Sequence, residues 1–267
     1  MTAAAIAAEP LLNLANVTAG YDRHPAVHHL SLTIEQGDML AVVGPNGAGK
    51  TTFLKLLAGE LAPIEGEVLW ARLAPVRVAH LAQLNRTDRS FPITVEDYVA
   101  SGLWHETGAW GGLGRSQRER VRHALGSLGL LSCARRVIGT LSGGEFQRMR
   151  FAQLMLQDAD LMLLDEPFAG IDATTISVLL PLMARWHGAG RTLVVVLHEL
   201  DLARQWFAKT LLLSRHCVAF GATETVLTDA NWQQAAGLTA AVWQSSNWCR
   251  PDASTVAVLP ADTGSGR

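Results

Sequence analysis

The sequence contains little cysteine. Its 267 residues include only Cys133, Cys217 and Cys249, which are widely spaced and form no Cys-x-x-Cys pair. An odd number of dispersed cysteines argues against a disulfide framework and against a zinc knuckle built on paired cysteines. We therefore expect a protein of a reducing compartment.

An excess of basic residues and a long apolar run are also missing. Lys and Arg number 22 against 24 Asp and Glu, which gives a net charge of −2, so no basic field gathers nucleic acid. No stretch reaches the roughly 18 uninterrupted apolar residues of a membrane span, and the first ten residues lack the basic start of a secretory signal. We expect no nucleic acid as main partner, and a membrane role only through another protein.

The composition that is present indicates a folded α/β protein. Hydrophobic residues make up 49% of the chain and charged residues 17%, as in globular proteins. Strand-like runs lie at 11–20, 31–44, 66–70 and 76–83, and a helix is expected over 53–61. The almost wholly apolar runs 158–167 and 191–200 favour interior strands of a parallel sheet.

A helical segment interrupts these strands. Residues 94–157 show helical spacing with glycine-rich breaks, and Thr94 with Asp97 forms a plausible helix start. One helix of this segment is expected to carry on one face Val121, Ala124, Leu125 and Leu128. A different helix, between the two apolar runs, is expected to carry on one face Ile176, Leu179, Leu180, Met183 and Trp186. We predict an α/β core with an inserted α-helical lobe, followed from about 236 by an extension with a frayed end.

The segment "GPNGAGKT" fits the phosphate-loop pattern G-x-x-x-x-G-K-[ST], directly after an apolar strand and before a helix. Its glycines allow backbone amides to surround phosphate oxygens, its lysine reaches the terminal phosphates, and its threonine hydroxyl can bind Mg²⁺. The predicted nucleotide-binding residues are Gly44, Pro45, Asn46, Gly47, Ala48, Gly49, Lys50, Thr51 and Thr52.

Two acidic residues end the apolar run "LMLLDEP". Asp165, at the end of a buried strand, can hold the magnesium shell. Glu166 is then placed to orient or deprotonate a water for attack on the γ-phosphate. Without the phosphate loop, the same two residues would be read as a solvated turn.

The segment "TLSGGEFQRMR" places two glycines at a helix start, where each is less favourable than alanine. Ser142 and Glu145 fit a capping box. Capping does not require Gly143 and Gly144, but both would expose backbone amides to an anion.

With these residues together, the chain resembles the ATP-binding subunit of an ABC transporter. "LSGGEFQR" is similar to that family's signature, with Glu145 where glutamine is commonest. By resemblance, Gln83 matches the Q-loop and would also ligate Mg²⁺, and Asp172 matches the D-loop. His198 likewise matches the switch histidine that contacts the γ-phosphate. Tyr21 matches the aromatic residue that stacks on adenine. Asp172 also reads as a plain helix N-cap, and the two roles are compatible.

The resemblance implies a fold and an assembly. The fold would be a P-loop NTPase (RecA-like) core with a parallel sheet, a small antiparallel β subdomain and an inserted α-helical subdomain. An ATPase domain would cover 11–235, with its core at 11–84 and 158–235 and the helical subdomain at 85–157, and an extension at 236–267. Two copies would sandwich ATP head to tail, with Ser142, Gly143 and Gly144 of one copy on the γ-phosphate bound by the other. The subunit would lie on the cytoplasmic face of the inner membrane, against a transmembrane permease.

The branch of the family is indicated by residues 85–104, in which "DRSFPITV" and "GLW" resemble ATPases of zinc and manganese importers. An extracytoplasmic metal-binding protein would then be an indirect partner. Iron-chelate or cobalamin importers remain the close alternative. A soluble ABC ATPase without a permease, or a small-molecule P-loop kinase, fits less well, because tandem units are missing and a kinase has no use for "LSGGE".

Several residues stay without a firm role. His24, His28 and His29 suggest a metal site, although they fall near the expected adenine platform. The arginines 115, 118, 120 and 122 read as a solvated helix face, or as a permease or lipid contact. Trp104 and Trp110 would pack locally or meet a membrane partner, and Cys249 has no assigned function.

Overall fold

The computed structural model describes residues 9–21, 24–71, 75–83, 89–108 and 111–242. The chain divides into two compact units, Met1–Leu73 with Val194–Arg267, and Ala74–Leu193. We call them unit 1 and unit 2. Trp110, Cys249 and residues 85–88 lie outside the described residues. Within the described ranges, no helix is both long and apolar enough to cross a membrane.

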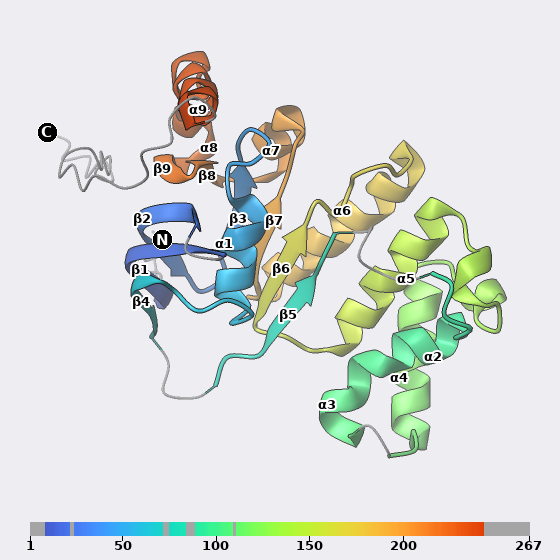
Figure 1. Cartoon of the computed structure of the whole chain (residues 1–267). Coiled ribbons are helices and arrows are strands. Elements are labelled where there is room, and N and C mark those ends of the chain that lie inside the picture. Colours follow the sequence, from blue (N-terminus) through green and yellow to red (C-terminus); the bar gives the residue numbers. More distant parts are fainter. Residues whose placement is uncertain (1–8, 22–23, 72–74, 84–88, 109–110, 243–267) are drawn as a thin grey trace, which may run out of the picture. The chain divides into compact units, whose positions relative to one another are not determined.

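Unit 1 contains most of the strands (Figure 1). Its elements are β1 (Pro10–Tyr21), β2 (His24–Glu35), β3 (Met39–Val43), α1 (Lys50–Leu57), β4 (Glu65–Trp70), α7 (Leu200–Trp206), β8 (Lys209–Ser214), β9 (His216–Ala222), α8 (Thr223–Val226) and α9 (Asp229–Val242). An antiparallel sheet has the order β2-β1-β4. Separately, β3 pairs in parallel with β8, and β8 pairs antiparallel with β9.

Unit 2 is mainly helical. Its elements are β5 (Val78–Leu81), α2 (Val95–Ala100), η2 (Ser101–Leu103), α3 (Trp104–Thr107), α4 (Arg115–Ser127), η3 (Leu131–Cys133), η4 (Ile138–Thr140), α5 (Gly143–Leu156), β6 (Leu161–Asp165) and α6 (Ala173–Gly188). Strand β7 (Thr192–Val196) begins in unit 2 and continues into unit 1. β5 and β6 pair in parallel.

The strands that were expected to be interior are buried along their whole length. Every residue of β6 and β7, the strands of the runs 158–167 and 191–200, is buried, as expected for strands covered on both faces. Every residue of β3 is buried as well, which was not predicted from the sequence. Helix α5 is also buried over much of its surface and packs against α2, α4 and α6 (Figure 1). The Phe151 ring of α5 stacks on Trp186 of α6 with centroids 5.9 Å apart. The core of unit 2 therefore forms around α5.

The helix start predicted at Thr94 is confirmed, and several other boundaries differ. Thr94 caps α2 by accepting from the Asp97 N–H, and the α4 face expected to be apolar is buried.

The run 31–44 is two strands rather than one, because residues 36–38 form a turn with Gly37 at φ 80°. The helix expected over 53–61 occupies Lys50–Leu57. Beyond 236, the chain continues in α9 to Val242 rather than becoming irregular at once.

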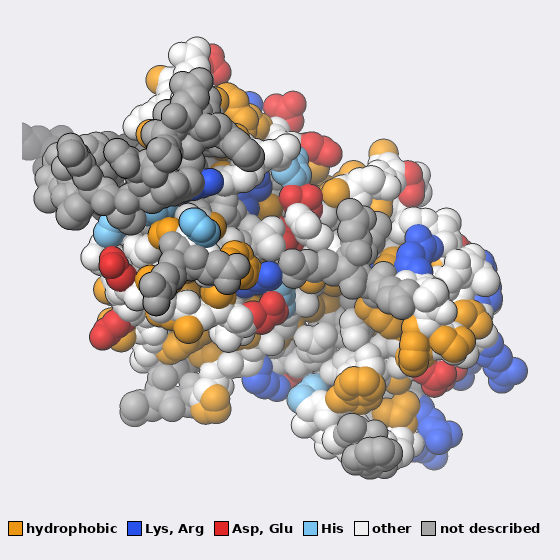
Figure 2. All heavy atoms as spheres, in the orientation of Figure 1, with side chains coloured by type: hydrophobic (Ala, Val, Ile, Leu, Met, Phe, Trp, Pro, Cys, Tyr) orange, Lys and Arg blue, Asp and Glu red, His pale blue; other side chains and the backbone are white. Residues whose placement is uncertain are grey.

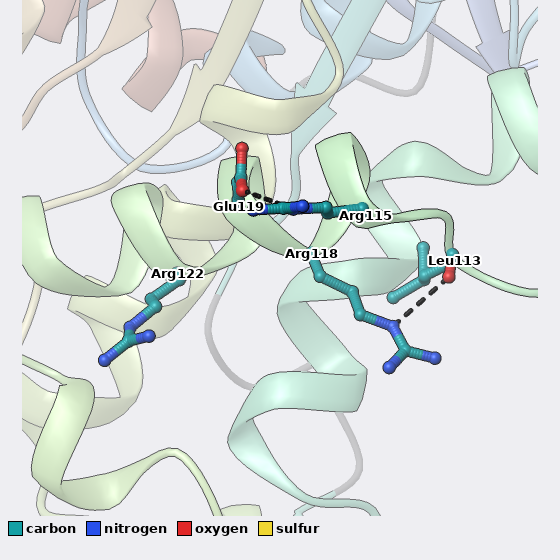
Figure 3. Close-up of a pocket in the computed structure, with 5 residues that line it drawn as sticks. All are labelled: Leu113, Arg115, Arg118, Glu119 and Arg122. Carbon is teal, nitrogen blue, oxygen red and sulfur yellow. Dashed lines mark hydrogen bonds and ion pairs between the residues drawn. The ribbon is translucent and has the colours of Figure 1, made fainter.

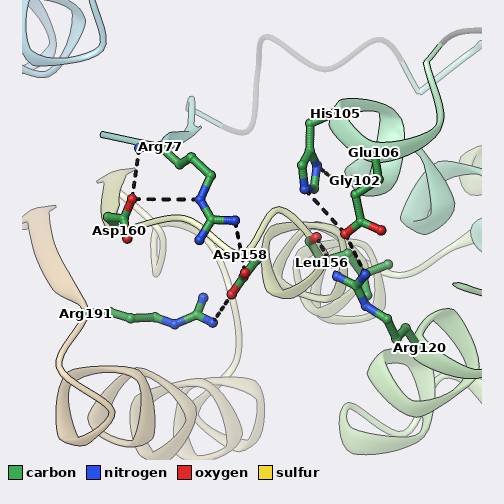
Figure 4. Close-up of polar contacts among 9 residues, drawn as sticks. All are labelled: Arg77, Gly102, His105, Glu106, Arg120, Leu156, Asp158, Asp160 and Arg191. Carbon is green, nitrogen blue, oxygen red and sulfur yellow. Dashed lines mark hydrogen bonds and ion pairs between the residues drawn. The ribbon is translucent and has the colours of Figure 1, made fainter. Parts of the chain in front are cut away.

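Ion pairs join the ends of elements within unit 2 (Figure 4). Asp158, between α5 and β6, contacts Arg77 at 3.0 Å and Arg191 at 2.7 Å. Arg120 of α4 contacts Glu106 at 2.5 Å and also donates to the Leu156 carbonyl. Arg120 was expected on a solvated helix face; its side chain is 38% exposed and in addition ties α4 to the ends of α3 and α5.

Candidate functional site

The phosphate-loop segment of unit 1 depends on glycine at two positions. Gly44 has φ 154°, and a Cβ there would lie 1.9 Å from the Leu213 carbonyl oxygen. Gly49 has φ 93°, and a Cβ there would lie 2.3 Å from the Ala26 carbonyl oxygen. A side chain at either position would collide with backbone. The glycines thus let the loop between β3 and α1 run close to two neighbouring strands.

Lys50 is held at the start of α1 by its own loop. Its Nζ donates to the Gly44 carbonyl at 2.7 Å and to the Pro45 carbonyl at 3.0 Å, and the residue is only 6% exposed. Gly49 occupies the N-cap position, and no side chain caps the helix. Uncapped N–H groups at a helix start, next to a buried ammonium group, form a setting that suits a phosphate.

His198 follows the strand next to β3. The Leu197 N–H, just past the end of β7, donates to the Val42 carbonyl at 3.0 Å. Val42 lies two residues before Gly44, so unit 1 brings the segment of His198 alongside the strand that leads into the phosphate loop. The His198 side chain is exposed.

Tyr21 lies at the end of β1, where it pairs with His24 of β2. Lys55 of α1 donates to the Tyr21 hydroxyl at 2.8 Å, and its Nζ lies 4.9 Å from the ring centroid. The tyrosine is still 45% exposed. Lys55, on the helix that follows the phosphate loop, thus orients this aromatic ring. The sequence did not indicate this role of the lysine.

The acidic end of β6 and Gln83 lie at the same edge of the β5–β6 pair in unit 2. Leu81 of β5 is in register with Leu164 of β6. Because the strands are parallel, Gln83 and the pair Asp165 and Glu166 emerge at the same edge. Asp165 is 2% exposed. Glu166 has φ 50°, an uncommon backbone conformation for a residue with a side chain and one that collects at functional sites.

The signature segment forms the predicted capping box. The Glu145 N–H donates to Ser142 Oγ at 3.2 Å, and the Ser142 N–H donates to Glu145 Oε2 at 2.8 Å. Glu145 Oε1 lies 3.3 Å from Arg136 Nη1 and accepts from the Cys133 thiol. The Ser142 hydrogen bonds and, less strongly, Arg136 hold the pKa of Glu145 below its usual value.

The D-loop aspartate lies directly beside this helix start. Asp172 caps α6 by accepting from the Thr175 N–H at 2.8 Å and from the Thr175 hydroxyl at 2.9 Å. A Cβ on Gly144 would lie 2.4 Å from Thr175 Oγ1 and 2.7 Å from Asp172 Oδ2. A side chain at position 144 would therefore have to displace the side chains of Thr175 and Asp172. A Cβ on Gly143 would meet nothing closer than the Gly170 carbonyl at 4.0 Å.

Four side chains that touch these segments were not predicted. They are Lys55 on Tyr21, Arg136 on Glu145, and Gln147 and Arg150, which contact the segments next to Glu166 and Gln83. The only available signal was the position of Gln147 and Arg150 on an otherwise apolar face of α5, where a buried polar residue needs a partner.

The histidines do not form a metal centre in the part of the chain that the structure describes. His28 stacks on His216 with ring centroids 5.0 Å apart, and His29 Nδ1 lies 3.0 Å from Asn16 Oδ1. Burial, followed by the nearby His216, lowers the pKa of His28 to about 4. His28 is therefore neutral at pH 7.

A hollow of about 300 Å³ on α4 is separate from these segments. It is lined by Leu113, Arg115, Arg118, Glu119 and Arg122. Arg115 pairs with Glu119 at 3.3 Å, and the guanidinium groups of Arg118 and Arg122 point in different directions (Figure 3). Separate Lys and Arg side chains, coloured blue, lie among hydrophobic and acidic ones on the face of the molecule that Figure 2 shows. The arrangement is that of a solvated basic face rather than of a convergent anion site.

Comparison with known proteins identifies the family. The family model described as ABC transporter matches residues 27–169. The chain is 34% identical over 230 residues to the manganese transport system ATP-binding protein MntB of Bacillus subtilis, covering 85% of this chain and 92% of that protein. It is 36% identical over 226 residues to the zinc transport system ATP-binding protein TroB of Treponema pallidum, covering 83% and 85%.

Solved structures show the same fold. A metal-chelate type ABC transporter in an inward-facing conformation matches with a TM-score of 0.76 and 27% identity, over 86% of this chain and 89% of that chain. An ATP-binding cassette of an ABC transporter in its ADP conformation matches with a TM-score of 0.73 at 19% identity, over 85% and 98%. The predicted α/β fold class is thereby confirmed. The chain belongs to the ABC transporter family, in which it is a nucleotide-binding subunit with ATPase activity.

Proposed function

We propose that the chain energises the uptake of a divalent metal ion, manganese or zinc, through a separate permease. The observation that carries this proposal is the 34–36% identity, over more than four fifths of the chain, to ATP-binding proteins of manganese and zinc transport systems. No residue of this chain need touch the transported ion. The metal would be chosen by the permease and by an extracytoplasmic binding protein.

The nucleotide would be bound by the phosphate loop and by Tyr21. Residues 44–52 would surround the phosphates with backbone N–H groups, and Lys50 would exchange its two carbonyl partners for phosphate oxygens. The ring of Tyr21, already oriented by Lys55 and 45% exposed, would stack on adenine.

Thr51, Gln83 and Asp165 would hold Mg²⁺. Their donors are a hydroxyl, an amide oxygen and a carboxylate, the hard oxygen ligands that Mg²⁺ takes. When bound, the ion would neutralise charge on the β- and γ-phosphates. Asp165 is almost completely buried at a strand end, which supports this role, because buried charged groups are paired with another charge or coordinate a metal.

Hydrolysis would depend on Glu166 and His198. The Glu166 carboxylate would orient and deprotonate the attacking water, and its uncommon φ of 50° supports a position set by function. His198 would donate to the γ-phosphate. Phosphoryl transfer needs positioning and charge stabilisation above all, which fits two polar groups fixed at strand ends.

A second copy of the chain would complete each site head to tail. Ser142, Gly143, Gly144 and Glu145 of one copy would face the γ-phosphate held by the other. Space for an anion beside Gly143 supports this, since a Cβ there would meet nothing within 4 Å except the Gly170 carbonyl. Asp172, fixed against Gly144, would carry the signal of closure across the dimer.

The subunit would lie at the cytoplasmic face of the inner membrane, against the permease. Phe91 and Trp104 of unit 2 are each 61% exposed, and such apolar side chains favour a protein contact. Closing of the ATPase dimer would drive the permease, and reopening after hydrolysis would reset it.

An importer of iron chelates or cobalamin is the second candidate, because a metal-chelate type transporter is 27% identical with a TM-score of 0.76. Deletion of the coding gene in its own organism tests both. Uptake of ⁵⁴Mn²⁺ or ⁶⁵Zn²⁺ should fall at least tenfold and return with the intact gene. Loss of iron-chelate or cobalamin uptake with unchanged metal-ion uptake would contradict the metal-ion assignment.

The residue roles need a separate test on the full chain. Glu166→Gln should retain ATP binding within about twofold of the wild type and lose hydrolysis by two orders of magnitude or more. Lys50→Ala should weaken ATP binding itself. Hydrolysis by the Glu166→Gln protein at the wild-type rate would contradict the assignment of the base.

A further inference from the structure

Arg150 is a buried guanidinium on the inner face of α5. The residue is 3% exposed. Its Nη2 donates to the Ala82 carbonyl, one residue before Gln83, and its Nη1 donates to Gln147 Oε1 at 3.2 Å. One hydrogen bond of the guanidinium thus joins the end of β5 to the signature helix, and the other holds Gln147 of the same helix.

Gln147 extends the connection to the other side. It is 1% exposed, and its Nε2 donates to the Pro167 carbonyl at 2.6 Å. Pro167 follows Glu166 directly, and the Glu166 carbonyl accepts from the Ala169 N–H at 3.2 Å in a tight turn. The chain of contacts therefore runs from Ala82 through Arg150 and Gln147 to Pro167, all within unit 2.

The partners of Arg150 are neutral. Among the residues that the structure describes, Arg150 forms no ion pair with a carboxylate, and its buried Nε makes no hydrogen bond. Burial lowers the pKa of Arg150, with Tyr98 partly opposing that effect. A buried charge without a counter-charge is unfavourable for stability, and an apolar residue of similar size is often as stable or more stable at such a position.

Stability alone therefore gives a weak reason for arginine here. Leu or Met would suit a helix whose other buried residues include Phe146, Met149 and Phe151. What only a guanidinium supplies is two diverging donors on one rigid plane. One donor reaches the Ala82 carbonyl next to Gln83, and the other reaches Gln147, whose own amide donates to the Pro167 carbonyl next to Glu166.

We propose that Arg150 is a positioning residue that, with Gln147, fixes the carbonyls of Ala82 and Pro167 and so holds Gln83 and Glu166 in place for hydrolysis. This rests on the roles proposed above for Gln83 and Glu166. The proposed role is exerted through the backbone next to Gln83 and Glu166, because the hydrogen bonds of Arg150 and Gln147 reach Ala82 and Pro167.

The test uses the full chain with Arg150→Met, Gln147→Leu and the control Gln153→Leu. Gln153 lies on the same helix and donates to Ser101 Oγ at 2.8 Å, so its substitution removes a side-chain hydrogen bond that reaches neither segment. Three quantities are measured for each protein: the melting temperature, kcat and KM for ATP, and amide hydrogen exchange in peptides that cover 78–83 and 164–170.

We expect Arg150→Met to lower kcat at least tenfold, with KM within twofold and a melting temperature equal to or above that of the wild type. Amide exchange should become faster in both peptides. Gln147→Leu should lower kcat and speed exchange mainly in peptide 164–170. Gln153→Leu should leave kcat and both peptides unchanged.

A merely structural arginine gives a different result, in which kcat falls only in proportion to a lowered melting temperature, or does not fall. Either outcome overturns the proposal, as does faster exchange with unchanged kcat. If instead the role proposed for Glu166 is wrong, the result differs from these outcomes, because Glu166→Gln would then still hydrolyse ATP at the wild-type rate.

Discussion

Gly144 lies so close to Asp172 that a Cβ at residue 144 would come within 2.7 Å of the Asp172 Oδ2 atom. The start of the signature helix and the capped start of α6 are thus packed against one another. The two glycines of the signature consequently serve different purposes. One is needed by the chain itself, and the other leaves space that nothing inside the described chain fills.

Gly144→Ala should destabilise the protein. The methyl group would displace Thr175 and Asp172, whose hydrogen bonds cap α6, and loss of a cap costs about 1–2 kcal/mol. Chemical denaturation should show a lower unfolding midpoint together with reduced ATPase activity. A midpoint equal to that of the wild type would contradict this packing argument.

Gly143→Ala should separate stability from activity. Its Cβ meets open space, and alanine is favoured over glycine in a helix by up to about 1 kcal/mol. The unfolding midpoint should therefore stay constant or rise, whereas ATP hydrolysis should fall at least tenfold because the methyl group obstructs the γ-phosphate. Full activity of this variant would show that no phosphate approaches residue 143.

Arg136 should favour ATP binding, because it pairs with the negatively charged Glu145. The 3.3 Å ion pair compensates a carboxylate at the place proposed for the γ-phosphate. Arg136→Ala should raise the KM for ATP several-fold, whereas the same change in a Glu145→Gln background should have little effect. A double-mutant cycle on KM measures this coupling. Equal effects in both backgrounds would mean that charge compensation is not the role of Arg136.

Asp158 should support stability above its pKa and lose this effect in acid. Burial would raise the pKa of Asp158, but Arg77 and Arg191 outweigh it and hold the value below normal. The stabilisation is thus complete at neutral pH and disappears as the pH falls through the lowered pKa. Because the side chain is 47% exposed, screening limits it to about 1 kcal/mol.

Asp158→Asn tests this with little backbone change, since asparagine also tolerates the φ of 46° at this position. The variant should be less stable than the wild type at pH 7, and the difference should shrink as the pH falls below 3.8, the ordinary pKa of an aspartate. A constant difference across that range would argue against the ion pairs.

His28 should make unit 1 sensitive to mild acid. The pKa of His28 is lowered to about 4 by burial first and then by His216, while Arg215 and His29 add smaller effects in the same direction. The unfolded chain therefore binds a proton more readily. The contribution of His28 to the free energy of unfolding is fully present above about pH 6.5. It decreases as the pH falls toward 4, by about 3 kcal/mol at most.

His28→Gln should remove much of this dependence. Between pH 7.5 and 5, the melting temperature of the wild type should fall further than that of the variant. Parallel curves would contradict the assignment. Lowering of the His216 pKa by burial should leave a smaller residual slope in the variant.

Features set by neighbouring residues in the sequence could be predicted from it. The phosphate loop, the capping box of Ser142 and Glu145, and the buried strands with their acidic ends follow from local spacing and burial. The reason for Gly144 could not be foreseen, because it depends on Thr175, which reaches the helix start only in the folded chain. The same holds for Arg150, whose partner Ala82 is 68 positions away, and for the His28–His216 stack.

Two copies of the chain are proposed to close head to tail on ATP, so that each completes the other's site. Light scattering on the Glu166→Gln protein, with and without ATP and Mg²⁺, measures this closure. We predict a shift from monomer to dimer with ATP that is lost in Glu166→Gln carrying Ser142→Arg. A protein that remains monomeric at saturating ATP would contradict the account.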